Sequence, residues 1–177
     1  MPSFTVGIDI GSKGAVAAFN GRRFYVRRWT NCDKYLQARN VEEFLHFIHN
    51  VDGTQFILPD VVICKGFGER INIVVPQANC AGYIEAEIKH KCASFSWEPD
   101  SSLRKDAGIN DWLKKNGRPT AHKKAEFQDA FREMTNMLAF YTNKDLQTFE
   151  LSPDEWDACI GAYGLWRNLH VCDQAGE

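Results

Sequence analysis

The sequence predicts one α/β domain over residues 1–177, in which a mixed five-stranded sheet carries helices on both faces. Three β-type runs follow one another near the N-terminus with short turns between them, as in an antiparallel meander. The later run at 59–64 is apolar without polar alternation, which is typical of a central strand buried on both faces. The length of 177 residues suits a single domain, because domains usually span ~100–200 residues.

The N-terminal meander is predicted from residue type and turn chemistry. Residues 4–10 are mostly apolar or β-branched and indicate the first strand, which a glycine-rich turn ends. Residues 15–19 and 24–29 indicate two more strands. Asn20 and Gly21 lie between them and favour a tight hairpin turn. The first three strands are therefore expected to pair antiparallel, before the parallel strands of the sheet.

The later elements alternate between helix and strand. Asn40 and Glu43 fit a capping box, and apolar residues follow at helical spacing as far as Val51. After the central strand at 59–64, residues 76–91 are predicted to form a second helix. The remainder is expected to contain a fifth strand at 93–97 and helices at 101–115, 120–141 and 153–169.

The last helix begins with a clear N-terminal signal. Ser152 can cap it, Pro153 suits the first helical position, and Glu155 completes a capping box. Asp154 and Asp157 then lie three residues apart on one face of the first turn. The helix dipole favours their ionised forms, but two adjacent carboxylates repel each other without a compensating cation. Acids are also common at helix N-termini without any metal, so this element alone leaves both interpretations open.

Asp9 is the second unusual acid, because it lies inside an apolar strand between Ile8 and Ile10. An ionised carboxylate is costly to bury unless it is paired or binds a metal. The alternative is an ordinary Asp at a strand end that accepts backbone hydrogen bonds from the glycine turn.

Three motifs in order carry a resemblance to a known family. They are Gly-Ile-Asp-Ile-Gly-Ser at 7–12, Val-Val-Ile-Cys-Lys-Gly-Phe at 61–67 and Asp-Glu-Trp-Asp-Ala at 154–158. Segments 79–85 and 99–105 are similar to the family's intervening helix and basic segment. The chain resembles the RuvC-type Holliday junction resolvases of the RNase H-like superfamily, and the phage-encoded branch most of all. The resemblance implies an RNase H-like fold and an endonuclease that resolves four-way and related branched DNA.

The resemblance also implies a carboxylate site for metal-dependent hydrolysis. Asp9, Asp154 and Asp157 match acids that in the family bind two Mg²⁺ ions, for which Mn²⁺ can substitute. The family's fourth catalytic acid is a Glu at the end of the central strand, and Cys64 stands at that position. A thiol is a soft ligand and a poor replacement for a carboxylate toward Mg²⁺.

Three explanations of Cys64 stay open. The residue was substituted deliberately, to trap uncleaved DNA or to allow cross-linking, or the natural protein has lost nuclease activity and kept junction binding. The third explanation is that another acid supplies the ligand, with Glu69 and Glu85 the nearest in sequence. With Cys64 present, we expect strongly impaired cleavage in Mg²⁺ and largely retained DNA binding.

A basic segment provides the expected DNA contacts. Residues 101–124 carry seven Lys or Arg and two Asp or Glu, although the whole chain has a net charge of −2. Such a run also occurs on solvated faces that bind no polyanion. By the resemblance, Phe67 stacks on a base at the junction crossover. The basic residues expected to contact DNA are Lys65, Arg104, Lys105, Arg118, Lys123 and Lys124.

Partners and compartment follow from symmetry and composition. A four-way junction is two-fold symmetric, so the resemblance implies a homodimer that makes paired incisions. No apolar run is long enough to span a bilayer and no secretory signal is visible, so we expect a cytoplasmic protein without a membrane partner. If a phage encodes the protein, that compartment is the host cell's. The six cysteines contain no C-x-x-C pair and are expected to be free thiols.

Other functions are compatible with parts of the sequence. Cys64 would suit a catalytically silent protein that binds branched DNA. Another RNase H-like nuclease, acting on RNA–DNA hybrids or flaps, would use the same acids. The motif at 7–12 also resembles the phosphate loop of sugar kinases and actin-like ATPases, but those proteins need two such domains, for which 177 residues are too few.

Overall fold

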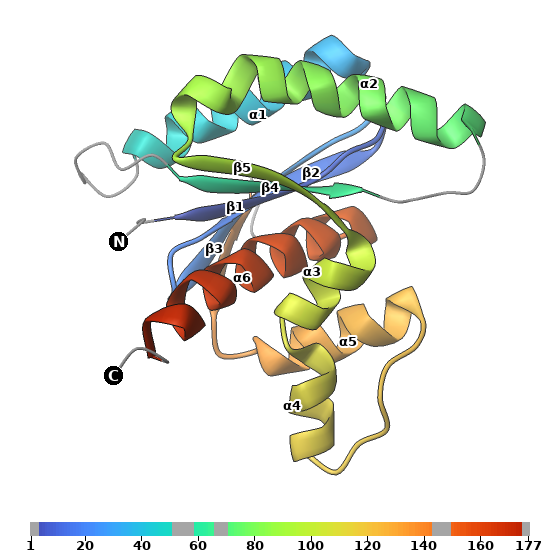
Figure 1. Ribbon diagram of the computed structural model, residues 1–177, viewed down its shortest axis with the longest axis vertical. Coiled ribbons are helices and arrows are strands. Elements are labelled where there is room, and N and C mark those ends of the chain that lie inside the picture. Colours follow the sequence, from blue (N-terminus) through green and yellow to red (C-terminus); the bar gives the residue numbers. More distant parts are fainter. Residues whose placement is uncertain (1–3, 51–58, 66–70, 143–149, 175–177) are drawn as a thin grey trace.

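A computed structural model of the chain describes residues 4–50, 59–65, 71–142 and 150–174. Its centre is a six-stranded sheet in the order β5-β4-β1-β2-β3-β6 (Figure 1). Strands β1, β2 and β3 pair antiparallel, β4 and β5 run parallel to β1, and β6 runs parallel to β3. The strands are β1 Thr5–Asp9, β2 Gly14–Phe19, β3 Arg23–Trp29, β4 Asp60–Lys65, β5 Ser94–Pro99 and β6 Ala139–Thr142.

Helices cover both faces of the sheet (Figure 1). One face carries α1 and α2, and the other carries α6; α3 and α5 pack against α6, and α4 packs against α3 and α5. The helices are α1 Lys34–Asn50, α2 Ile71–Ile88, the short 3₁₀ helix η1 Lys89–Lys91, α3 Asp100–Asp106, α4 Ile109–Lys115, α5 Lys124–Met134 and α6 Pro153–Gln174. Within the described ranges, no helix has the length and apolar character needed to cross a membrane.

Strand β1 contributes to both layers of the core, because successive side chains of a strand point to opposite faces. Val6 and Ile8 are fully buried among the apolar residues of α1 and α2. Gly7 faces α6 so closely that a Cβ built on it would lie 2.2 Å from the Ala158 carbonyl oxygen. The Thr5 hydroxyl donates a hydrogen bond of 2.7 Å to the Ala162 carbonyl. Helix α6 therefore rests directly on the backbone of the central strand.

The hairpin between β2 and β3 confirms the predicted turn chemistry. The Asn20 side-chain oxygen accepts hydrogen bonds from the backbone N–H groups of Arg22 and Arg23, at 3.1 and 3.0 Å. Gly21 has a φ of +88°, a conformation that glycine adopts without steric cost. These contacts set the antiparallel register in which Phe24 lies opposite Phe19.

The sheet contains a sixth strand where the sequence predicts the end of a helix. The predicted helix at 120–141 was wrong at both ends, because α5 covers only Lys124–Met134 and β6 follows it. Phe140 of β6 stacks on Phe24 with ring centroids 4.9 Å apart and an interplanar angle of 10°. Pairing with β3 thus decides the conformation of this segment, since aromatic cross-strand pairs stabilise a strand more than local propensity favours a helix.

Other helix boundaries also differ from the prediction: α2 begins at Ile71 instead of residue 76, and α6 extends to Gln174 instead of residue 169. The helix expected at 101–115 is two helices, because Gly108 adopts a left-handed φ of +68° between α3 and α4. Helix α1 begins at Lys34, before Asn40, and the Asp33 carboxylate accepts the N–H of Leu36 at 2.9 Å as an N-cap does. The predicted capping box at Asn40 was therefore wrong, and the Asn40 amide instead donates to the Leu36 carbonyl inside the helix.

We expect Gly7→Ala to destabilise the protein by about 1–3 kcal/mol, because the added methyl group overlaps the backbone of α6. The matched control is Gly82→Ala on α2, where a Cβ meets nothing within 4 Å. That variant is expected to gain up to ~1 kcal/mol from helix propensity. Urea unfolding followed by circular dichroism measures both changes. Equal stabilities of the two variants would contradict the close packing of α6 on β1.

Candidate carboxylate site

Three acids predicted from the sequence lie at one end of the central strand. Asp9 is the last residue of β1 and, two residues after Gly7, lies on the same face of the sheet as α6. Asp154 and Asp157 occupy the first turn of α6. That turn is fixed by the predicted capping box: the Ser152 N–H donates to Glu155 at 2.7 Å, and the Glu155 N–H donates to the Ser152 hydroxyl at 3.3 Å. Local sequence thus determines where α6 begins.

Asp157 is the most buried of these acids, with 5% of its surface exposed. Its Oδ2 atom lies 2.5 Å from the Nζ atom of Lys124, the first residue of α5. Its Oδ1 atom accepts a hydrogen bond of 2.8 Å from the Gln128 amide, which also donates to the Pro153 carbonyl at 2.9 Å. Both carboxylate oxygens are therefore held by α5, and Lys124 is brought into the site.

Electrostatics connect the acids with one another. Desolvation raises the pKa of Asp9 well above its ordinary value, and the negative charges of Asp157, Asp154 and Asp100 raise it further. The positive charge of Lys124 lowers the pKa of Asp9 and offsets part of this effect. Desolvation also raises the pKa of Asp154. Burial opposes the charged form of Lys124, but the hydrogen bond and charge of Asp157, together with Asp9 and Asp100, raise its pKa overall. The single ammonium group of Lys124 therefore interacts electrostatically with several carboxylates.

Asp100 is the member of this group that the sequence interpretation missed. It is the first residue of α3 and directly follows β5. The signal that could have found it is its place at the carboxyl end of a parallel strand, because these ends meet at one edge of a sheet. Its Oδ2 atom lies 3.3 Å from the guanidinium of Arg104.

Cys64 lies next to Asp9 in the backbone register. In the parallel pairing of β1 with β4, Cys64 is the partner of Asp9, and β5 places Glu98 beside Cys64. Of the two acids considered as substitutes, Glu69 lies outside the described residues. Glu85 belongs to α2, whose buried residues pack against the opposite face of the sheet, so the structure excludes it from the site.

The basic residues predicted to contact DNA lie in different environments. Lys124 contacts the acids directly, and Lys123 is exposed just before α5. Arg118 pairs with Glu133, and its guanidinium carbon is 5.9 Å from the centroid of the Trp112 ring. Lys65 ends β4 and Phe67 lies outside the described residues, so their expected DNA contacts stay predictions.

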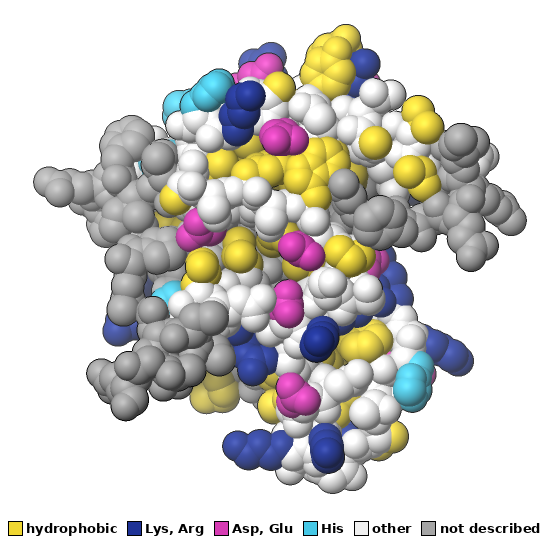
Figure 2. Space-filling view, in the orientation of Figure 1, with side chains coloured by type: hydrophobic (Ala, Val, Ile, Leu, Met, Phe, Trp, Pro, Cys, Tyr) yellow, Lys and Arg dark blue, Asp and Glu magenta, His cyan; other side chains and the backbone are white. Residues whose placement is uncertain are grey.

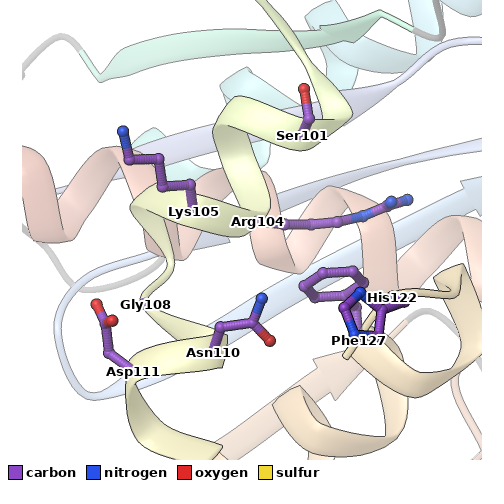
Figure 3. Close-up of a pocket in the computed structure, with 8 residues that line it drawn as sticks. All are labelled: Ser101, Arg104, Lys105, Gly108, Asn110, Asp111, His122 and Phe127. Carbon is purple, nitrogen blue, oxygen red and sulfur yellow. The ribbon is translucent and has the colours of Figure 1, made fainter. Parts of the chain in front are cut away.

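Arg104 and Lys105 line a pocket of about 290 Å³, and Arg104 also pairs with Asp100. In Figure 3, Arg104 extends toward Phe127 and His122, whereas Lys105 points away from them. The guanidinium carbon of Arg104 lies 5.1 Å from the Phe127 ring centroid, a cation–π distance. Figure 2 shows several Lys and Arg side chains over the part of the molecule formed by α3, α4 and α5. Positive charge is therefore available close to the acids.

The donor chemistry of the site suits a hard divalent cation. Asp9, Asp154 and Asp157 offer carboxylate oxygens, the ligands that Mg²⁺ prefers. Over the described part of the chain, however, no three His, Cys, Asp or Glu side chains are close enough to form a ready-made metal cluster. The cation that the structure places at the acids is the Lys124 ammonium. The residues fit a metal that would share Asp157 with Lys124 or displace it.

Solved structures with a similar fold include a complex with a Holliday junction and a Holliday junction resolvase. Thermus thermophilus RuvC in complex with a Holliday junction substrate superposes with a TM-score of 0.57 and 8% identity over 95% of this chain and 96% of that chain. The T. thermophilus RuvC structure on its own matches with a TM-score of 0.57 and 10% identity, over 96% of both chains. The yeast mitochondrial Holliday junction resolvase Ydc2 matches with a TM-score of 0.52 and 10% identity, over 98% of this chain and 84% of that chain.

The chain has the RuvC fold. The comparison confirms the RNase H-like architecture that the motifs implied, with six strands in place of the expected five. No family model and no curated protein matches the sequence. At 8–10% identity the RuvC likeness is one of structure, so the roles of individual residues need their own argument.

We expect Asp9→Asn to stabilise the metal-free protein at neutral pH. The pKa of Asp9 is higher in the folded than in the unfolded chain, so the folded state binds more protons between the two values. The stability of the unmodified protein therefore falls as pH rises through that window, and the variant avoids this loss.

Urea unfolding in EDTA between pH 4 and pH 8 measures the difference, with Asp129→Asn, an exposed acid of α5, as the control for lost charge. The gain from Asp9→Asn should grow with pH. Parallel curves for Asp9→Asn and the unmodified chain would show that ionised Asp9 is not destabilising.

Proposed function

We propose that the chain is a structure-specific endonuclease that resolves four-way and related branched DNA by metal-dependent hydrolysis of phosphodiesters. The observation that carries the proposal is the meeting of Asp9, Asp154 and Asp157 at the end of β1 on a RuvC fold. The matching RuvC structure is itself in complex with a Holliday junction substrate. The two-fold symmetry of such a junction favours a homodimeric enzyme.

Asp9, Asp154 and Asp157 would hold Mg²⁺, or Mn²⁺ in its place. When bound, the metal supplies activation of a water molecule and charge stabilisation at the leaving oxygen of the phosphodiester. The capping box at Ser152 and Glu155 keeps the two helix acids on the first turn of α6. The Gln128 amide fixes the orientation of the Asp157 carboxylate and leaves its other oxygen to a cation.

Lys124 has two roles in this proposal. In the protein without metal or DNA, its ammonium neutralises Asp157 and lowers the repulsion among the acids. When a DNA phosphate lies at the site, the same ammonium provides positive charge beside the scissile bond. Its place at the start of α5 connects the carboxylates with the basic segment at 101–124, which carries Arg104 and Lys105.

The thiol at Cys64 makes the chain a weak Mg²⁺-dependent enzyme in this proposal. The backbone register sets position 64 beside Asp9, where a carboxylate would add a hard ligand. We expect Cys64→Glu to accelerate the cleavage of a labelled four-way junction in Mg²⁺ by about 10-fold or more, with paired symmetric nicks. Junction affinity in EDTA should change little, since phosphate contacts dominate it.

The control for that experiment is Asp157→Asn in the Cys64→Glu background, which should abolish cleavage and retain junction binding. Equal cleavage by the chain and its Cys64→Glu variant would contradict the role given to position 64. Cleavage of RNA–DNA hybrids or flaps in preference to junctions would indicate another RNase H-like nuclease.

A catalytically silent protein that binds branched DNA is the second candidate, and Cys64 is the observation that favours it. Junction binding by the chain and by Cys64→Glu, without cleavage by either, would support this function.

The basic residues near the site should contribute to junction binding through phosphate neutralisation. We expect Arg104→Gln and Lys123→Gln each to weaken binding and to reduce the slope of log K against log salt by about 0.9. Lys89→Gln is the control, because Lys89 lies on η1 before β5, at the other end of the sheet. Fluorescence anisotropy over a salt series measures the slopes. Identical slopes for all three variants would place the DNA elsewhere.

A further inference from the structure

Gln37 is a polar side chain buried in the apolar face of α1. Only 2% of its surface is exposed, and the other buried residues of this helix are apolar. A buried amide is costly unless its donors and its acceptor are hydrogen-bonded. The partners of Gln37 therefore explain what this residue contributes to the fold.

The Gln37 amide binds the turn between β1 and β2. Its Oε1 atom accepts the N–H of Gly11 at 3.2 Å, and its Nε2 atom donates to the Cys32 carbonyl at 3.1 Å. Cys32 donates its own N–H to the Ser12 carbonyl at 3.1 Å, which closes a ring of hydrogen bonds between α1 and the turn. The Trp29 indole holds the same turn, since its Nε1 atom donates to the Gly11 carbonyl at 2.9 Å.

The Gly11 N–H is the donor that Asp9 would otherwise use. An Asp side chain commonly accepts the backbone N–H of the residue two positions later, in an Asx-turn. Gly11 is that residue, and the sequence left open that Asp9 is held in this way. In the structure the Gly11 N–H donates to Gln37 instead. Among the described residues, no hydrogen bond or ion pair engages the Asp9 carboxylate.

Gln37 and Asp9 act on opposite faces of the sheet. Helix α1 covers one face, whereas Asp9 faces the acids of α6 on the other (Figure 1). The hydrogen bond to Gln37 therefore directs the donor of the turn toward α1. An Asx-turn would direct the Asp9 carboxylate toward its own backbone instead of toward α6.

We propose that Gln37 is a positioning residue that takes the Gly11 N–H from Asp9 and so keeps the Asp9 carboxylate directed at α6. The inference rests on the proposed function, in which this carboxylate takes part in cleavage, and it adds a residue from the opposite face of the sheet. Without the Gln37 amide, the Gly11 N–H is expected to donate to Asp9, because glycine has no side chain that resists rotation of its peptide. Asp9 then adopts a different χ1 rotamer.

The χ1 rotamer of Asp9 tests the inference, measured by NMR from the couplings of its β-protons in the full chain without metal. Gln37→Met removes the acceptor at nearly constant length, and Gln37→Asn withdraws the amide from Gly11. We expect both variants to move Asp9 to a second rotamer. Gln37→Glu keeps an oxygen that accepts the Gly11 N–H and should retain the original rotamer. Val41→Ala, at a fully buried position about one turn further along α1, is the control for lost stability.

Cleavage kinetics provide the second readout. In the Cys64→Glu background, Gln37→Met should lower kcat on a four-way junction by about 10-fold, because a displaced catalytic group slows the chemical step. KM and junction affinity in EDTA should stay unchanged. Val41→Ala in the same background should leave the kcat of the folded enzyme unchanged, since lost stability alone does not move Asp9.

Each outcome decides for or against the positioning role. An unchanged Asp9 rotamer in Gln37→Met and Gln37→Asn would overturn it, as would the same rotamer change in Gln37→Glu or Val41→Ala. A new rotamer in an enzyme that keeps its kcat would overturn it too.

Failure of the inference and failure of the proposed function are distinguishable, because the rotamer is measured without DNA. If the rotamer changes as expected but Cys64→Glu cleaves no branched DNA, the proposed function fails and the effect of Gln37 on Asp9 stands. If Cys64→Glu cleaves junctions and neither the rotamer nor kcat responds to Gln37→Met, the positioning role fails and the proposed function stands.

Discussion

The close approach of α6 to β1 at Gly7 is the contact on which the candidate site depends. No side chain separates the two elements there, and a Cβ on Gly7 would lie within 2.5 Å of the Ala162 nitrogen. Because Asp9 follows Gly7 by two residues, and Asp157 precedes Ala158 by one, the same contact brings the two acids together. The hydrogen bond from Thr5 to Ala162 continues this contact toward the other end of the strand. A bulkier residue at position 7 would move α6 and separate the acids.

The acids that α6 and β1 bring together oppose the stability of the fold. Desolvation of Asp9 beside Asp157 disfavours its charged form, and Lys124 offsets only part of that cost. Unfavourable burial of charge is characteristic of functional sites, where the arrangement of charges that function requires lowers the stability of the fold. The Gln128 amide in contrast stabilises the site, because it donates hydrogen bonds to both Asp157 and Pro153. The unfavourable contribution of Asp9 is therefore electrostatic.

Much of the fold could be predicted because its signals are local. The Asn20-Gly21 turn, the apolar central strand and the capping box at Ser152 each act within a few residues, and the structure confirms them. The failures came from competition between local and long-range contacts. Residues 139–142 form β6 because Phe140 stacks on Phe24, more than one hundred positions earlier. Asn40 resembled an N-cap, but Asp33 caps the helix instead, so that the true start lies about two turns earlier.

The sequence by itself determined which acids are unusual, since Asp9 in an apolar strand and the Asp154/Asp157 pair on a capped helix are recognisable from residue type and spacing. It also indicated an antiparallel meander followed by parallel strands, which the sheet confirms, with β6 as an additional strand. Only the tertiary structure decided that Lys124 and Gln128 hold Asp157, and that Glu85 belongs to a helix on the opposite face of the sheet. Sequence spacing limits which residues share a face of one helix or strand, but distances between elements are set by packing. The partners of a charge therefore become known only when the sheet and its helices are assembled.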